Sequence, residues 1–140
     1  MTPLYTAEAL ATGGGRNGRV TTPSGRVNLD MAVPTEMGGA GNGSNPEELF
    51  AAGYATCFHS ALQAAARARK VDLGDSSVGG RVHVLAIDGG GFGLAVDLEV
   101  VIPELDPVLA QEIADEAHKL CPYSNATRGN IAVTITVTDD

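Results

Sequence analysis

The 140-residue sequence is short of basic side chains and of cysteine. Nine lysines and arginines stand against 17 acidic residues, which gives a formal net charge of −8. No basic patch stands out, so binding to a nucleic-acid phosphate backbone or to an anionic membrane surface is disfavoured. The first ten residues, MTPLYTAEAL, have no basic region and contain Glu8, so we expect no secretory signal. The two cysteines are therefore expected as reduced thiols in the cytoplasm, where disulfides tend to be transient and catalytic.

One uncharged run is long enough to raise the question of a membrane. Leu49–Ala66 has no charged side chain if His59 is neutral, and its length approaches that of a membrane span. The run is rich in alanine, however, and contains the polar residues Thr56, Ser60 and Gln63. We therefore expect a helix buried within a soluble protein.

The rest of the pattern predicts one α+β domain over residues 1–140, a length that can bury a core. Alternating apolar and polar residues between glycine-rich turns predict strands. The expected strands are Tyr5–Ala11, Arg19–Thr22, Val27–Val33, Val78–Ile87, Phe92–Ile102 and Ile131–Val137. With the helices below, this order predicts a mainly antiparallel sheet packed around a long buried central helix.

Two helices are expected. Asn45-Pro46-Glu47-Glu48 combines an N-cap residue, a proline suited to the first helical position, and acids at the positive end of the helix dipole. It predicts a helix that runs to about Lys70. This helix is apolar or small on nearly every face and should be covered all round. A second, amphipathic helix is expected over Asp106–Leu120, with Pro122 as its stop.

The two cysteines are the strongest indication of chemistry. Thiols that can meet can be oxidised to a disulfide and reduced again. Cys57 lies twelve residues past the N-cap, beyond the effect of the helix dipole, and burial among aromatic residues would raise its pKa. Cys121 follows a helix C-terminus, where a thiolate is disfavoured, so it suits a resolving role better than that of first nucleophile. The alternative that both are small buried hydrophobic residues is about equally compatible with their spacing.

A reactive Cys57 would need a cation from elsewhere in the chain. Arg16, on a glycine-rich turn, is always charged and presents a planar fork of donors. Glu47 could fix this fork through a two-point contact. Arg19 is close enough in sequence to remain a second candidate.

Three segments carry a more specific pattern: GGRNG (Gly14–Gly18), NPEELFAAGYATCF (Asn45–Phe58) and CPYSNATRGN (Cys121–Asn130). Together they closely resemble the organic hydroperoxide resistance proteins, Ohr, of the wider OsmC/Ohr family. The resemblance covers nearly the whole chain in order, and CPYSNAT is specific to the Ohr branch.

The resemblance implies a thiol-dependent peroxidase that reduces organic hydroperoxides to alcohols. In this interpretation Cys57 is the peroxidatic thiol and Cys121 the resolving thiol, while Arg16 and Glu47 polarise the thiolate and the peroxide. The resemblance also implies no metal or bound cofactor, and a dithiol reductant such as dihydrolipoamide on a lipoylated protein. It further implies an intertwined homodimer with two sites at its interface.

The spacing of two of these residues independently favours a dimer. Glu47 and Cys57 are ten residues apart, which is about 15 Å of rise on an unbroken helix. A glutamate side chain spans only part of that distance. An antiparallel partner in a two-fold dimer would bring its own Glu47 near this Cys57 and would help to cover the apolar helix.

Rival interpretations make other use of the same residues. A Cys–His hydrolase could use His59 or His118 as its base, but it would explain neither Cys121 nor Arg16. A non-enzymatic carrier could hold a small apolar molecule or a lipid beside the long helix. A metal site built from both cysteines and both histidines is disfavoured, because Cys57 and His59 diverge on a helix.

Overall fold

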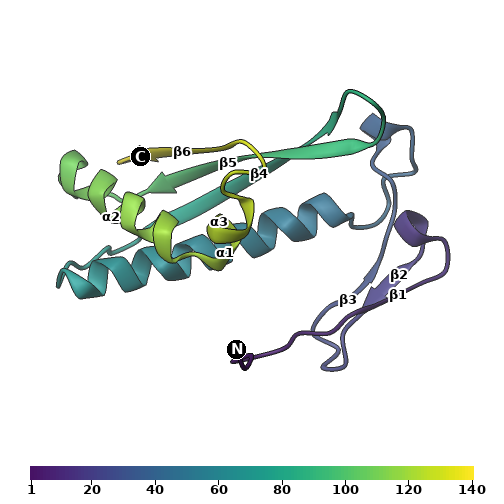
Figure 1. Cartoon of the computed structure of the whole chain (residues 1–140), viewed down its shortest axis with the longest axis horizontal. Coiled ribbons are helices and arrows are strands. Elements are labelled where there is room, and N and C mark those ends of the chain that lie inside the picture. Colours follow the sequence, from purple (N-terminus) through teal and green to yellow (C-terminus); the bar gives the residue numbers. More distant parts are fainter. The chain divides into compact units, whose positions relative to one another are not determined.

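A computed structural model describes all 140 residues of the chain (Figure 1). Its elements in chain order are β1 (Leu10–Thr12), η1 (Gly15–Asn17), β2 (Arg19–Thr21), β3 (Asn28–Asp30), η2 (Thr35–Met37), α1 (Pro46–Ala68), β4 (Ser77–Ala86), β5 (Phe92–Val101), α2 (Pro107–Leu120), α3 (Pro122–Thr127) and β6 (Val133–Thr138). Contacts divide the chain into two compact units, Met1–Leu49 and Phe50–Asp140. The α+β class predicted from the sequence is confirmed.

The first unit, purple to blue in Figure 1, contains a three-stranded antiparallel sheet in the order β1-β2-β3. The predicted strand over Tyr5–Ala11 is wrong for most of its length. Only Leu10–Thr12 pair with β2, and the residues before Leu10 have no strand opposite them to accept their hydrogen bonds. The alternation of side chains over Tyr5–Ala11 therefore predicted a strand, but most of this segment has no neighbouring strand to pair with.

The turn between β1 and β2 is the short 3-10 helix η1, which carries Arg16. Gly18 ends this turn and closes against the preceding strand, because a Cβ at residue 18 would lie 2.0 Å from the carbonyl oxygen of Thr12. Only glycine allows the backbone to pass so closely. The glycine-rich turn predicted around Arg16 is therefore a tight structure.

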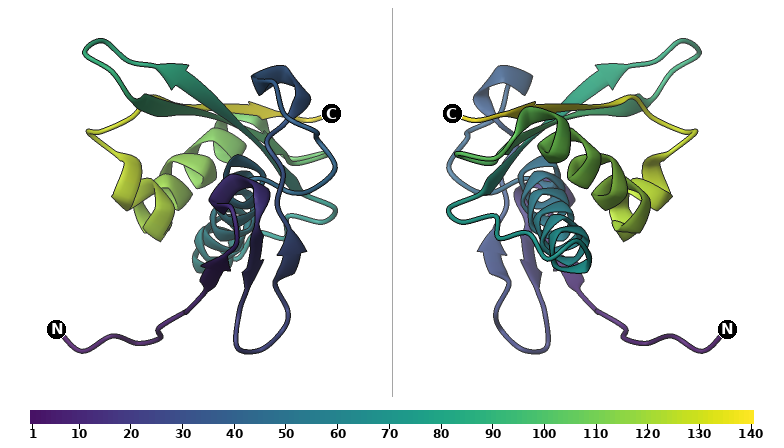
Figure 2. Two further views of the ribbon diagram at one scale, coloured as in Figure 1. Left: turned by 90° about the vertical axis from the view of Figure 1, so that its right-hand side faces the viewer. Right: turned by 90° about the vertical axis from the view of Figure 1, so that its left-hand side faces the viewer.

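The second unit contains a three-stranded sheet in the order β4-β5-β6, with α1 from Phe50 onwards and α2 on one face (Figures 1 and 2). β4 and β5 form the predicted antiparallel hairpin. β6 pairs with β5 in parallel, which the sequence did not reveal because side-chain alternation carries no information on strand direction. The sheets remain mainly antiparallel, as predicted.

Helix α1 begins where the sequence indicates. The side chain of Asn45 accepts a hydrogen bond of 2.8 Å from the backbone N–H of Glu48, and the helix ends before Lys70, whose φ of 58° is left-handed. Tyr54, Phe58 and Leu62, spaced by four, are fully buried in the core against Val96, Leu98 and Val100 of β5. No helix has both the length and the apolarity needed to cross a membrane.

The chain by itself does not cover α1 on every side. Ala52, Thr56 and Ser60 are exposed, and their spacing by four places them on one line along the helix. All three are small and uncharged. The face is thus one that a further surface could cover without leaving a buried charge.

Helix α2 starts as predicted, since the side chain of Asp106 accepts from the backbone N–H of Leu109, and it ends at Leu120. Pro122 was predicted as a stop, and it is also the first residue of a further helix, α3, which the sequence analysis missed. The two functions are compatible. Proline cannot extend α2, yet its fixed φ suits the first position of a new helix.

Candidate redox site

The two cysteines of the chain lie in contact. The Sγ atom of Cys121 is 3.5 Å from the Sγ atom of Cys57, and both thiols are free. Cys57 is half-buried on α1, whereas Cys121 is completely buried between α2 and α3. Because a disulfide bond is about 2.05 Å long, the sulfurs need to approach by only about 1.5 Å to form one. The arrangement is suited to reversible disulfide formation within one chain.

The backbone holds Cys121 in place from both sides. Its N–H donates to the carbonyl oxygen of Ala117, 2.9 Å away in the last turn of α2. Its carbonyl oxygen accepts from the N–H of Asn125, 3.0 Å away in α3. The extended backbone at Cys121, with φ −66° and ψ 121°, is the break that separates the two helices. The resolving position proposed from the sequence is thus a fixed corner rather than a loose loop.

The surroundings of Cys57 oppose its ionisation. Burial raises the pKa of the Cys57 thiol, and the backbone N–H of Tyr123, at the start of α3, lowers this pKa in part. The neighbouring Cys121 thiol raises it further. This direction matches the expectation from the sequence. If Cys57 reacts as a thiolate, a positive charge from outside helix α1 must therefore stabilise that thiolate.

Arg16 and Glu47 form the two-point contact expected from the sequence. Nη1 of Arg16 donates to Oε2 of Glu47 over 2.9 Å, and Nη2 donates to Oε1 over 2.8 Å. The Glu47 side chain is only 15% exposed, and the hydrogen bonds from Arg16 lower its pKa below the usual range. Arg19, the second candidate, pairs instead with Asp30 and Asn28 on β3. Arg16 is thus held by Glu47 as expected, whereas Arg19 is held by residues of β3.

The four residues singled out from the sequence thus occur as two pairs. Arg16 and Glu47 pair within the first unit, and Cys57 and Cys121 pair within the second.

An open cavity of about 420 Å³ borders Cys57. The rest of its wall consists of Thr56, Ser60, Ala61, Ala64, Leu120 and Pro122, and most of its surface is apolar. Leu120 is more than half exposed, which leaves the cavity accessible from solvent. Such a lining favours an apolar substituent beside the sulfur over a small polar molecule.

The two histidines proposed as alternative bases are engaged elsewhere. Nε2 of His59 lies 3.0 Å from Oγ of Ser76, and Nδ1 of His118 lies 2.8 Å from Oγ of Ser124. Neither contact is to a cysteine. The geometry therefore gives no support to a Cys–His nucleophile.

Sequence reasoning placed aromatic residues around Cys57 but missed that Tyr123 packs against two of them. The ring of Tyr123 packs 5.8 Å from that of Phe50 and 5.6 Å from that of Tyr54. Its hydroxyl lies over Gly53, where a Cβ would come within 2.7 Å of it. Tyr123 stands in the segment that begins at Cys121, which the sequence analysis had singled out. Nothing in the spacing of that segment indicates which residues of α1 Tyr123 contacts.

Comparisons with known proteins agree on one family. A family model described as OsmC-like protein matches residues 39–136. The chain is 48% identical over 136 residues to the organic hydroperoxide resistance protein of Xanthomonas axonopodis pv. citri (strain 306), a match that covers 96% of this chain and 94% of that protein.

Solved structures give the same result across the full length. A crystal structure of an organic hydroperoxide resistance protein from Elizabethkingia anophelis, with thiocyanate bound, is 45% identical with a TM-score of 0.94 and covers 100% of both chains. One from Legionella pneumophila, described as an organic hydroperoxide resistance protein OsmC, is 46% identical with a TM-score of 0.93 and covers 98% of this chain and 99% of that chain. The chain is similar to both in sequence and in fold.

Proposed function

The chain belongs to the OsmC/Ohr family, and on this premise we propose that it is a thiol-dependent peroxidase that reduces organic hydroperoxides to alcohols. The Cys57 thiolate attacks the outer oxygen of the hydroperoxide, the O–O bond breaks, and the alcohol leaves after taking up a proton. Cys57 is then a sulfenic acid. The sulfur of Cys121 attacks the Cys57 sulfur and displaces the hydroxyl, which leaves as water with the thiol proton of Cys121.

The contact of 3.5 Å between the two sulfurs carries this proposal. It favours a resolving step within one chain, because the second thiol already touches the first. The difference in exposure agrees with this order of events. Cys57 can be reached from solvent, whereas Cys121 is completely buried and reaches only Cys57. This difference in exposure supports a peroxidase over a protein with two merely structural cysteines.

The proposed substrate is a hydroperoxide with an apolar alkyl or lipid group. The apolar cavity beside Cys57 offers such a group a surface to bury, which hydrogen peroxide lacks. The names of the similar proteins from Xanthomonas and Elizabethkingia agree with this substrate class.

Arg16 and Glu47 complete the proposed site from a homodimer. Their bidentate pair presents an oriented guanidinium, and the raised pKa of Cys57 calls for such a charge. Because ten residues of one helix separate Glu47 from Cys57, we propose that the pair of each protomer serves the Cys57 of its partner. The exposed, uncharged line of small residues on α1 gives this dimer a face to cover.

The remaining elements of the proposal rest on the family resemblance. Residues 1–140 act as a single domain in the cytoplasm, without a metal or bound cofactor. A dithiol such as dihydrolipoamide on a lipoylated protein reopens the disulfide by thiol exchange.

A steady-state assay driven by a lipoyl reducing system tests the proposal. Cumene hydroperoxide should be consumed with a higher kcat/KM than hydrogen peroxide, and Cys57→Ser should abolish consumption of both. Ser76→Ala removes the hydroxyl that contacts His59, and it should leave the rate unchanged. Consumption that survives in Cys57→Ser would overturn the assignment.

A further inference from the structure

We propose that the hydroxyls of Tyr54 and Ser124 are positioning groups that hold α3 against α1 and thereby keep Cys121 ready to close the disulfide. The proposal rests on the peroxidase function above and assigns to these residues a part in its second step only.

The contact between these hydroxyls runs beside the contact between the sulfurs. Oη of Tyr54 lies 2.9 Å from Oγ of Ser124, and both side chains are completely buried. Tyr54 precedes Cys57 by three residues, and Ser124 follows Cys121 by three residues. The hydrogen bond is therefore displaced from the sulfur pair by about one helical turn on each side. It fixes the spacing and the register of the two segments that carry the thiols.

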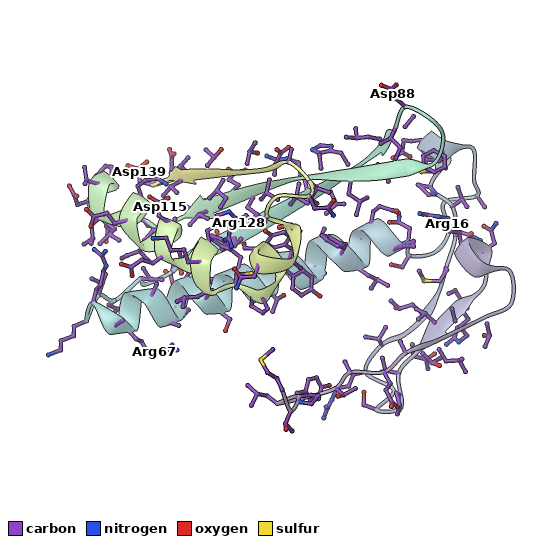
Figure 3. The ribbon with its side chains drawn as sticks, viewed as in Figure 1. Arg16, Arg67, Asp88, Asp115, Arg128 and Asp139 are labelled. Carbon is purple, nitrogen blue, oxygen red and sulfur yellow. The ribbon has the colours of Figure 1, made fainter.

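Further contacts extend this arrangement to α2. Oη of Tyr54 also lies 3.1 Å from Oγ1 of Thr127, and Nδ1 of His118 lies 2.8 Å from Oγ of Ser124. Arg128, labelled in Figure 3, donates from Nη2 to the carbonyl oxygen of His118 over 2.5 Å. No buried side-chain polar atom lacks a partner. The polar network thus joins α1, α2 and α3 around the corner at Cys121.

The histidine of this network is suited to a neutral role. Burial lowers the pKa of His118, and the positive charge of Arg128 lowers it further. The neutral ring can share a hydrogen bond with Ser124 without placing an unpaired charge in the core.

Helix α3 needs such contacts because it is only six residues long. A helix of this length is not stable by itself, so its place is set by what it packs against. When Cys57 is a sulfenic acid, Cys121 must approach its sulfur by about 1.5 Å while a second peroxide molecule competes for the same atom. A buried hydrogen bond one turn away keeps the approach short and raises the effective concentration of the second thiol.

The two steps should therefore respond differently to loss of the network. Attack of Cys57 on the hydroperoxide needs no approach of Cys121, so it should slow much less than closure. Any slowing of this first step should come only from a displaced Tyr123 N–H, which lowers the pKa of Cys57 when it is in place. Closure of the disulfide should slow by about tenfold, roughly the change that the loss of one buried hydrogen bond makes in a conformational equilibrium. The share of Cys57 that goes on to sulfinic acid should rise correspondingly.

Tyr54→Phe and Thr127→Val test this, since each removes a hydroxyl and nearly preserves size. One equivalent of cumene hydroperoxide is mixed with reduced protein, and peroxide loss, trapped sulfenic acid and disulfide are followed by rapid quench and intact mass. Ser124→Ala adds a third variant, and Ser76→Ala is its matched control, because Ser76 also pairs with a histidine nitrogen but contacts no residue of α3. Thr127→Ser keeps the hydroxyl and should close at the wild-type rate.

Closure that slows much more than peroxide loss in Tyr54→Phe and Thr127→Val would support the positioning role. Wild-type closure in these two variants would overturn it, and so would an equal slowing of both steps or an equal effect of Ser76→Ala. The same variants can be closed with oxidised glutathione, where Cys121 displaces glutathione from Cys57. A failure of wild-type protein to react with hydroperoxide would count against the proposed function alone, since this second assay still measures positioning.

Discussion

Replacement of Arg16 gives the sharpest test of how Cys57 is activated. Burial raises the pKa of Cys57, so without a cation only a small fraction of this thiol is ionised at pH 7. A positive charge within about 4–6 Å lowers the pKa of a thiol by about 1–3 units. If Arg16 supplies that charge, Arg16→Ala should raise the pKa of Cys57 and slow its oxidation at pH 7 roughly a hundredfold.

The geometry of the Arg16–Glu47 pair predicts a graded series. Arg16→Lys keeps the charge but cannot reproduce hydrogen bonds of 2.8 and 2.9 Å to both oxygens of Glu47, so it should recover only part of the rate. Arg19→Ala is the matched control, because Arg19 is the other arginine close to this turn and pairs with Asp30. It should change oxidation by less than about twofold, as exposed pairs contribute little.

The assay is the pH dependence of Cys57 alkylation by iodoacetamide in Cys121→Ser protein, together with stopped-flow oxidation by cumene hydroperoxide. Folding of each variant is checked by its thermal midpoint. An unchanged alkylation profile in Arg16→Ala with a large effect of Arg19→Ala would transfer the function to Arg19. No effect of either would refute activation by this turn.

Three further predictions concern the dimer, the ion pair and the helix. Mixed Glu47→Ala and Cys57→Ser chains should regain activity that neither homodimer has, and full activity of a sedimenting monomer would contradict a shared site. Hydrogen bonds from Arg16 lower the pKa of Glu47 below its ordinary value of 4.5. The stability that this ion pair gives the folded chain is therefore present in full above pH 4.5 and is lost as the pH falls through the lower pKa of the folded state. Urea unfolding of Glu47→Gln should therefore differ from wild type by about 1 kcal/mol at pH 7 and converge with it in acid, whereas a constant difference would contradict the assignment. Gly53→Ala adds a Cβ 2.7 Å from Oη of Tyr123, so the Tyr123 ring must shift and the near-ultraviolet circular dichroism should change. Because alanine favours the helix by about 1 kcal/mol, the free energy of unfolding should stay within about 1 kcal/mol of the wild type.

Local patterns in the sequence were sufficient for the long elements. The cap at Asn45 and the alternation in β4 and β5 predict helix and hairpin because both signals lie within a few neighbouring residues. The parallel pairing of β6 with β5 depends on the path of the chain through α2 and α3, which no local pattern encodes. The same limit applies to Tyr5–Ala11, whose alternation lacked a partner strand.

The candidate site shows the limit more clearly. Arg16 and Glu47 are 31 residues apart, and Cys57 and Cys121 are 64 apart. Residue chemistry suggested both pairings but left alternatives open for each, and the roles of the four residues came only from the family resemblance. The hydroxyl pair one turn from the sulfurs was missed, since a tyrosine at i−3 from a cysteine in an apolar helix reads as ordinary core.

The central claim is that Cys57 and Cys121 of one chain form a disulfide when an organic hydroperoxide is reduced. One equivalent of cumene hydroperoxide added to reduced protein, followed by thiol titration and intact mass, tests it directly. The account predicts loss of both thiols and of two hydrogen atoms per chain without linkage between chains, while Cys121→Ser should stop at sulfenic acid on Cys57 and then overoxidise. Two free thiols that survive excess hydroperoxide in the wild type would contradict the account.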